Sequence, residues 1–236
     1  MMRAIKYAVA ALTIVLGLSM GMVSAEGGDN MLENIHWLGH ASFRITGEKV
    51  IYVDPWEIKN PLPADVILIT HEHFDHCSPA DVQKLVGANT VVVTTPDCAS
   101  KLKAKVRTVK PGEAFTVAGI KIETVAAYNT NKQFHPKSKE WVGYIFSING
   151  MRIYSAGDTD HIPEMKTLKD IDVALVPVSG TYVMTADEAV NAVKDINPKV
   201  AAVPMHYGKI VGTKADAQRF AQGLKGVTNV VIMDAE

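Results

Sequence analysis

Three histidines and one aspartate lie within residues 71–76, which read HEHFDH and directly follow the apolar run of residues 66–70. Imidazole and carboxylate groups suit zinc, iron or manganese. Because His71, His73, Asp75 and His76 cannot all reach one tetrahedral ion at this spacing, the pattern predicts two metal ions side by side. A loop that is rich in histidine by chance is the alternative, but such a loop has no reason to follow a buried strand.

The elements next to this cluster must hold it in place. Residues 35–38, 42–46 and 50–53 are short β-rich runs separated by glycine turns, which predicts a meander. Residues 66–70 are typical of a buried strand. After the cluster, Ser78 is a candidate N-cap, Pro79 takes the first helical position and Asp81 completes a capping box. The metal motif is therefore expected on a strand-to-helix loop.

The second half of the chain repeats this organisation. Asn149-Gly150 predicts a hairpin between residues 141–148 and 151–155, and Thr185 with Glu188 predicts a capped helix over 185–196. Further helices are expected over 96–102 and 216–224, and further strands over 90–94, 106–109, 115–117, 120–125, 172–177, 200–204 and 230–232.

Two more candidate ligands stand just past the ends of apolar strands, as His71 does. Asp158 follows the predicted hairpin, and His206 follows the run 200–204. Because strand ends present side chains to a shared cleft, we expect all three to face one site.

The N-terminus has the features of a signal peptide. Arg3 and Lys6 precede the uncharged stretch 7–23, and small residues at 23–25 predict cleavage after Ala25. A retained membrane anchor is the alternative. The remaining residues, 26–236, suffice for one domain with a substantial core, which we expect outside the cytoplasm with no stable membrane span after cleavage.

Charge and cysteine content narrow the function further. The net charge of −1 among 236 residues offers no field to recruit nucleic acid, so a small-molecule substrate is expected. Oligomeric state cannot be read from the sequence. Cys77 and Cys98 could pair in an oxidising compartment, but the position of Cys77 beside the metal motif favours free thiols.

The motif His-x-His-x-Asp-His resembles the signature of the metallo-β-lactamase superfamily of metal-dependent hydrolases. Other matching segments spread the resemblance over nearly all of the mature chain, and the set is most similar to the branch that contains ascorbate-6-phosphate lactonases. The resemblance implies an αββα sandwich, in which two mixed β-sheets pack face to face with helices outside. The other matching segments are Gly39-His40-Ala41-Ser42-Phe43, Asp54-Pro55, Gly157-Asp158-Thr159 and Pro204-Met205-His206-Tyr207-Gly208.

The resemblance also implies which residues bind the two ions. The first metal would take His71 and His73, the second Asp75, His76 and His206, with Asp158 bridging them. The family's third histidine for the first metal is missing where Asn129 stands, so we assign His135, whose alternative is an exposed loop histidine. His40 is a further candidate ligand, with packing as its alternative, and Asp54 would orient an imidazole through its other nitrogen.

Two divalent ions imply a hydrolytic mechanism. The ions, zinc first and manganese or iron as alternatives, would acidify a bridging water whose hydroxide attacks a small ester, lactone or phosphodiester. Asp75 would orient that hydroxide, and Tyr182 would be an oxyanion donor or simply a packing residue. Lysines near the site would contact an anionic substrate or face solvent: Lys209, Lys132, Lys137 and Lys139.

Two other functions fit the same motif. A di-iron redox protein would use the same scaffold, but it calls for an acidic ligand at the first metal, and Glu72 is not at a ligand position. A metal-binding module without turnover would fit if His135 did not bind metal. Antibiotic hydrolysis is disfavoured by the closer resemblance to the lactonase branch, and RNA processing by the short chain and the balanced charge.

Overall fold

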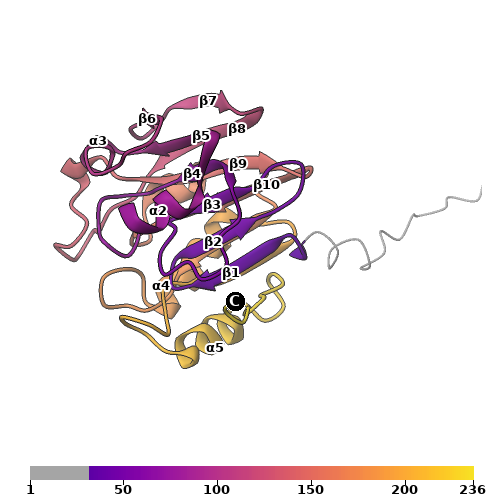
Figure 1. The fold of residues 1–236 in the computed structure, drawn as a ribbon. Helices are drawn as coiled ribbons and strands as arrows, with labels where there is room; N and C mark the ends of the chain where they lie inside the picture. The colour runs from indigo at the N-terminus through magenta and orange to yellow at the C-terminus, as the bar shows by residue number, and fades with distance from the viewer. Residues whose placement is uncertain (1–31) are drawn as a thin grey trace, which may run out of the picture.

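The computed structural model describes residues 32–236, so the predicted signal segment lies outside the described residues. Two six-stranded mixed sheets pack face to face, with helices on their outer sides (Figure 1). The predicted αββα sandwich is therefore confirmed. Within the described residues, no helix is long and apolar enough to cross a membrane.

The first sheet comprises the N-terminal half of the described chain. Its strands lie in sequence order: β1 (Ile35–Gly39), β2 (Ser42–Ile45), β3 (Ile51–Val53), β4 (Ala64–Leu68), β5 (Val86–Thr94) and β6 (Val106–Thr108). The first three form the predicted antiparallel meander, whereas β3 to β6 run parallel. The short helices α2 (Pro79–Leu85) and α3 (Pro96–Ala99) follow β4 and β5, respectively.

The second sheet has the order β12-β11-β10-β9-β8-β7. Its strands are β7 (Ala114–Val117), β8 (Ile120–Ala126), β9 (Val142–Ile148), β10 (Met151–Ser155), β11 (Val173–Pro177) and β12 (Ala201–Met205). The Asn149-Gly150 hairpin is confirmed between β9 and β10. Two 3-10 helices, η1 (Lys137–Lys139) and η2 (Pro163–Thr167), lie in loops. Helix α4 (Ala186–Ile196) packs on β11 and η2, and α5 (Lys214–Gly223) packs on α4.

Side chains that point alternately to the two faces of the first sheet belong to two separate hydrophobic clusters. On β4, Val66 and Leu68 face the large core between the sheets, while Ile67 joins a second cluster with Val82 and Leu85 of α2. Successive side chains of a strand point to opposite faces, so a continuous apolar run is required where both faces are covered. Each large side chain buried in this way contributes about 1.5–3 kcal/mol of transfer free energy.

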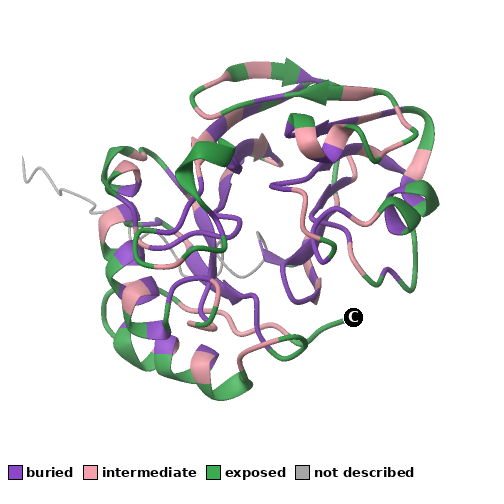
Figure 2. Cartoon of the chain, turned by 90° about the vertical axis from the view of Figure 1, so that its left-hand side faces the viewer, coloured by how far each residue is buried: buried purple, intermediate pink, exposed green. Residues whose placement is uncertain are grey.

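The carboxyl ends of the parallel strands meet at one edge of the sandwich. Strands β3 and β4 of the first sheet run parallel to each other, and so do β10, β11 and β12 of the second. Figure 2 looks onto the side that lies on the left in Figure 1, where buried loop segments surround the centre and the helices turn exposed faces outward. The loops at these strand ends carry the candidate ligands.

Two local predictions were wrong. Residues 230–232 form no strand: Val230 makes one isolated bridge to Ala202, and the chain then leaves to reach β1, where the Glu236 amide donates to the Trp37 carbonyl. The capping box at α2 is also absent. Ser78 does cap the helix, but the Asp81 carboxylate instead accepts hydrogen bonds from the backbone amides of residues 57 and 58. The Thr185–Glu188 box of α4 is confirmed.

Candidate metal centre

The loop after β4 folds back on itself and gathers the histidines of the motif. The amides of His76 and Cys77 both donate to the His73 carbonyl, over 3.0 and 2.7 Å, which forms a tight turn before α2. This turn places His71 Nε2 3.1 Å from His73 Nδ1 and packs the rings of His71 and His76 at 4.1 Å between centroids. Two ring nitrogens at such a distance need a proton or a cation between them.

Asp158 lies at the centre of the site because a glycine precedes it. Gly157 has φ of +65°, and a Cβ there would approach Thr70 atoms to 3.1 Å. Only glycine allows this conformation and close contact together. The Asp158 carboxylate is then surrounded by imidazole nitrogens: His206 Nε2 lies at 3.0 Å, His135 Nε2 at 3.2 Å and His76 Nε2 at 3.3 Å.

The potential ligand atoms form overlapping groups, within each of which all lie within 4.8 Å of one another. Two ligands about 2.1 Å from one tetrahedral ion are about 3.4 Å apart, so the separations around Asp158 have the right scale. Six of the eight histidines in the chain belong to these groups. The groups are His71 with His73 and His135, His71 with His76 and Asp158, and His40 with Asp75, His76 and His206.

Several inward-facing atoms are buried without a hydrogen-bond partner. They include the Nε2 atoms of His76, His135 and His206, and Oδ1 of Asp158. Buried polar atoms are nearly always satisfied, so a cluster of exceptions needs an explanation, such as an ion. Imidazole and carboxylate are suitable donors for divalent metals. The residues present therefore fit a metal centre.

The opposite ring nitrogens are held by the surrounding protein. Asp54 Oδ2 lies 2.8 Å from His76 Nδ1, Thr70 Oγ1 3.0 Å from His71 Nδ1, and Ser179 Oγ 3.1 Å from His206 Nδ1. Asp54 also accepts from the Thr70 amide and hydroxyl. Such partners fix the ring orientation and leave Nε2 free for a metal. Asp54 thus occupies the orienting position expected for it.

The carboxylates and imidazoles of the cluster shift one another's pKa values. Burial opposes ionisation of Asp158, yet the surrounding histidines hold its pKa well below the ordinary value. Burial likewise opposes the charge of His76, but Asp158 and Asp54 raise its pKa well above the ordinary value. For Asp75, the hydrogen bond from His40 and the charge of His76 outweigh burial and lower the pKa to about 2. A metal that binds His76 must therefore compete with protons for this imidazole.

His135 and His40 both lie in the cluster. His135 is 1% exposed, so it is not an exposed loop histidine. Asn129, at the position where a histidine was sought, instead accepts a hydrogen bond from the His135 amide over 2.9 Å and anchors its loop. His40 Nε2 lies 3.0 Å from Asp75 Oδ2, and its ring centroid is 4.0 Å from that of His206. His40 is placed either to bind metal or to orient Asp75.

Three residues of the site hold a left-handed backbone. His40, Asp54 and His206 have φ of 53°, 44° and 61°. The amide of His206 donates to the His40 carbonyl over 2.8 Å, which joins a turn of the first sheet to a strand end of the second. Such conformations cost about 1–3 kcal/mol each for residues other than glycine, and they persist only where the surroundings impose them.

The four lysines considered as substrate contacts are all bound in ion pairs. Lys209 pairs with Glu57, Lys132 with Asp160, Lys137 with Glu164, and Lys139 with Glu72. None of them lines the pocket over the metal cluster, in which Tyr182 does take part. The expectation that they contact an anionic substrate receives no support from their positions, because each already has an acidic partner.

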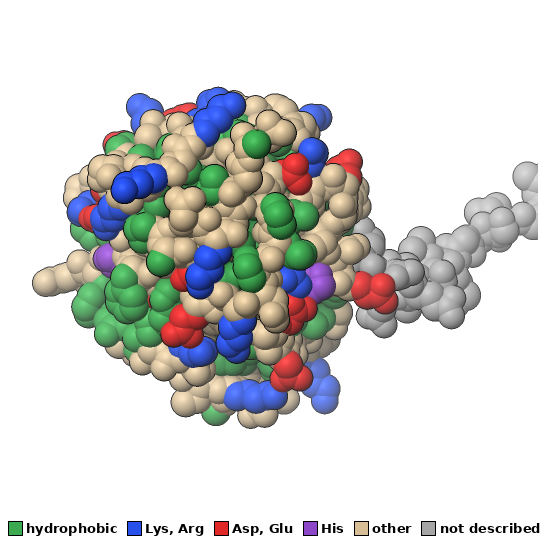
Figure 3. All heavy atoms as spheres, viewed as in Figure 1, with side chains coloured by type: hydrophobic (Ala, Val, Ile, Leu, Met, Phe, Trp, Pro, Cys, Tyr) green, Lys and Arg blue, Asp and Glu red, His purple; other side chains and the backbone are tan. Residues whose placement is uncertain are grey.

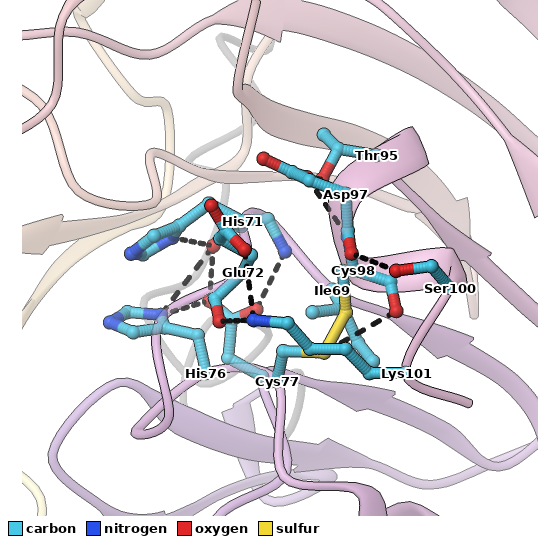
Figure 4. The surroundings of a disulfide bond; sticks show 12 residues. Ile69, His71, Glu72, His76, Cys77, Thr95, Asp97, Cys98, Ser100 and Lys101 are labelled. Carbon is cyan, nitrogen blue, oxygen red and sulfur yellow. Dashed lines mark hydrogen bonds and ion pairs between the residues drawn. A yellow bond between two sulfur atoms is a disulfide. The ribbon is translucent and has the colours of Figure 1, made fainter. Parts of the chain in front are cut away.

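The expectation of free thiols was wrong. Cys77 and Cys98 form a disulfide that joins the loop after the metal motif to helix α3, with 6.3 Å between the Cα atoms (Figure 4). Both residues are buried, and Glu72 and Lys101 lie close to the bond. The position of Cys77 next to the motif was taken as a sign of a free thiol, but the disulfide at this position fastens the metal loop to helix α3.

Sequence reasoning missed three supporting residues. Thr70 and Ser179 orient ring nitrogens, and Trp141 packs its ring 4.9 Å from both His71 and His73. Thr70 immediately precedes the motif and Ser179 follows β11, so their positions at strand ends were available signals. Nothing in the sequence around Trp141 marks it, because its contact depends on how the two sheets pack.

Comparison with known proteins agrees with this geometry. The family model described as a beta-lactamase superfamily domain matches residues 34–206. The chain therefore belongs to the beta-lactamase superfamily of metal-dependent hydrolases. It is 32% identical to the UPF0173 metal-dependent hydrolase of Thermoplasma volcanium, over 84% of this chain and 94% of the relative.

Solved structures show the same fold. A protein of Parabacteroides distasonis assigned as a metal-dependent hydrolase is 37% identical, with a TM-score of 0.75 over 86% of this chain and 93% of its own. A Thermotoga maritima protein assigned as a Zn-dependent hydrolase of the metallo-beta-lactamase superfamily is 26% identical, with a TM-score of 0.60 over 86% of this chain and 98% of its own. The nearer resemblance to ascorbate-6-phosphate lactonases stays a prediction.

Proposed function

We propose that this protein is a binuclear metal-dependent hydrolase that acts on a small ester, lactone or phosphodiester, with zinc as the first-choice metal. The observation that carries the proposal is the set of unpartnered Nε2 atoms around Asp158, whose histidines belong to three overlapping ligand groups, more than a single ion needs. When bound, two divalent ions supply a water of lowered pKa as nucleophile and polarise the substrate's oxygen. His71, His73 and His135 would hold one ion, and the second would lie among Asp75, His76 and His206.

The chain's own groups support this chemistry. Asp75 has its pKa lowered to about 2, so its carboxylate is ionised at neutral pH and could accept a hydrogen bond from a water held by the ions. Tyr182 lines the pocket with the ligands, where its hydroxyl can donate to the oxygen that gains negative charge. The pocket holds about 250 Å³, below the roughly 300–1,000 Å³ of sites for drug-sized ligands, which favours a small substrate.

The di-iron alternative lacks its acidic ligand. Glu72, the one acidic residue of the motif outside the predicted ligand positions, pairs with Lys101 at 2.9 Å and Lys139 at 3.0 Å. These pairs hold its pKa at about 2, and Glu72 belongs to none of the ligand groups of the described residues. The predominance of imidazole in that group suits zinc.

The proposal is tested by metal analysis and hydrolysis with matched histidine variants. We expect two ions per chain, and turnover of p-nitrophenyl acetate, a γ-lactone or bis(p-nitrophenyl) phosphate. His135→Ala should reduce metal content toward one ion per chain and lower turnover at least 100-fold. His161→Ala is the control, because His161 pairs with Asp195 outside the ligand groups. Two ions without turnover of any substrate would favour a binding module, and bound iron with oxidase activity would favour the redox alternative.

We also propose that the mature protein is exported. A buried disulfide within the hydrolase fold is typical of an oxidising compartment, which supports the predicted signal segment. Mass spectrometry of the protein isolated from its source should find Glu26 at the N-terminus. Recovery of the full-length chain in the cytoplasmic fraction with reduced cysteines would refute the proposal.

A further inference from the structure

The walls of the metal pocket are apolar wherever they are not ligands. Apart from five candidate ligands, the pocket is lined by Phe74, Phe134, Tyr182 and Ile210. Among residues 32–236, no lysine or arginine lines it. Recognition of a phosphate or carboxylate group generally requires such cations or several backbone amides.

The same residues stand out on the protein surface. Phe74 is 68% exposed, Phe134 48% and Ile210 41%, and these are three of the five large exposed hydrophobic side chains of the described residues. Single exposed apolar residues are ordinary, but their concentration around one pocket indicates a binding surface. Figure 3 shows hydrophobic side chains gathered beside a histidine at the left edge of the view, while lysines and acidic residues intermingle elsewhere.

The rim residues are held by neighbours. Phe134 packs edge-on against Tyr182 with 4.6 Å between ring centroids, and Phe74 lies edge-on to Trp56 at 6.1 Å. Phe74 and Phe134 are each adjacent in sequence to a candidate ligand, Asp75 and His135. A substrate whose reacting group lay at the ligand atoms would therefore have the rest of its structure close to these rings.

We infer that the site prefers an uncharged carboxylic ester or lactone whose alkyl or aryl group lies against Phe74, Phe134 and Ile210, over substrates that carry a charged group at that position. This inference rests on the proposed function and narrows its substrate class. It follows from continuity of the apolar rim with the metal pocket and from the absence of cationic side chains in the described lining. The lysines nearest in sequence to these pocket residues are paired with acidic partners; Lys209, next to Ile210, lies 2.8 Å from Glu57.

Chain-length dependence of hydrolysis is the first test. Fully burying one methylene corresponds to about a fourfold gain, so kcat/KM of the metal-loaded protein should rise up to about 16-fold from p-nitrophenyl acetate to the butyrate. Phe134→Ala and Phe74→Ala should each reduce that ratio at least threefold. Leu62→Ala, which changes an exposed apolar residue outside the pocket, should leave it unchanged. Two bound ions and an unchanged melting temperature would show that each variant is folded.

Ligand binding separates this inference from the proposed function. In NMR titrations of the metal-loaded protein, 2-octanone should bind more tightly than 2-hexanone. In turn, 2-hexanone should bind more tightly than 4-oxopentane-1-sulfonate, whose tail has the same length but ends in a sulfonate, an anion that binds divalent metals weakly. If no substrate is turned over, the proposed function fails, and this order of affinities still supports the apolar pocket. Turnover with a flat chain-length series, or tighter binding of the charged ketone, would overturn the inference alone. The inference would also be overturned if the protein cosedimented with phosphatidylcholine vesicles, Phe74→Ala abolished this binding, and hydrolysis did not depend on chain length. Those results would show that the apolar residues around the pocket bind a lipid surface.

Discussion

Replacing Asp54 by asparagine should weaken one metal site and spare the other. The Asp54 side chain is fully buried, and Oδ2 lies 2.8 Å from His76 Nδ1 while Oδ1 accepts from the Thr70 amide over 2.7 Å. With the amide oxygen kept on the Thr70 amide, the new NH₂ group faces His76 Nδ1. That contact favours a tautomer in which Nδ1 accepts and Nε2 carries the proton. A protonated Nε2 cannot bind a metal.

The expected magnitude follows from the position of Asp54 behind a ligand. Loss of such an orienting partner costs about 10- to 100-fold in metal affinity, or about 1.4–2.7 kcal/mol. Asparagine tolerates the left-handed backbone at this position, so the turn itself should survive. The group of His71, His73 and His135 does not contain His76 and should keep its ion.

Competition with a chromophoric chelator, together with elemental analysis, measures both sites. We expect one ion of unchanged affinity and a second that is 10- to 100-fold weaker in Asp54→Asn. Asp81→Asn is the control: its carboxylate is also buried and accepts two backbone hydrogen bonds, but it lies outside the ligand groups. Two ions of unchanged affinity in Asp54→Asn would refute the tautomer argument.

Three further results are expected. Removal of the metal by a chelator should lower the melting temperature by about 5–10 °C for each site, if the free metal concentration had been 100 times the Kd of that site, because the ligands join both sheets. An unchanged melting temperature in calorimetry would contradict this. The pKa of His76 is raised, so the stability that protonated His76 gives the metal-free protein should be lost as pH rises from about 6.5 through that raised value. Over the same pH range metal binding should become tighter, and each binding event should release protons. Titration calorimetry in two buffers measures this proton release, and its absence would argue against a charged His76. Removal of the disulfide with Cys77→Ala and Cys98→Ala should lower the free energy of unfolding by about 3 kcal/mol, because the bond closes a loop with a separation of 21 residues. Urea unfolding measures this loss, and equal unfolding midpoints for the variant and the unchanged protein would disprove it.

The motif and the strand ends were predictable because they are local. Apolar runs followed by His71, Asp158 and His206 place ligands at strand ends, and parallel strands bring those ends to one edge. The last strand was not predictable. Residues 230–232 have the composition of a strand, but the C-terminal segment runs to β1 and β2, where the Glu236 amide donates to the Trp37 carbonyl and its carboxylate pairs with Arg44. Tertiary competition of this kind has no local signal.

The orienting residues and the disulfide show a second limit. The Ser179 hydroxyl lies 3.1 Å from a ring nitrogen of His206, which is 27 residues later in the sequence. Cys77 and Cys98 are close because α2 and β5 return the chain to the metal loop. Pairings across such distances follow from the fold, which is why the sequence alone led to the wrong expectation of free thiols.

The left-handed backbone at His40, Asp54 and His206 bears on how this site can change over evolutionary time. At each position glycine would relieve an unfavourable conformation, so selection for stability and selection for metal binding act in opposite directions there. A lineage released from the need to bind metal would gain stability by losing these side chains first. Glycine at two or three of these positions would therefore mark a descendant that has kept the sandwich and abandoned the chemistry.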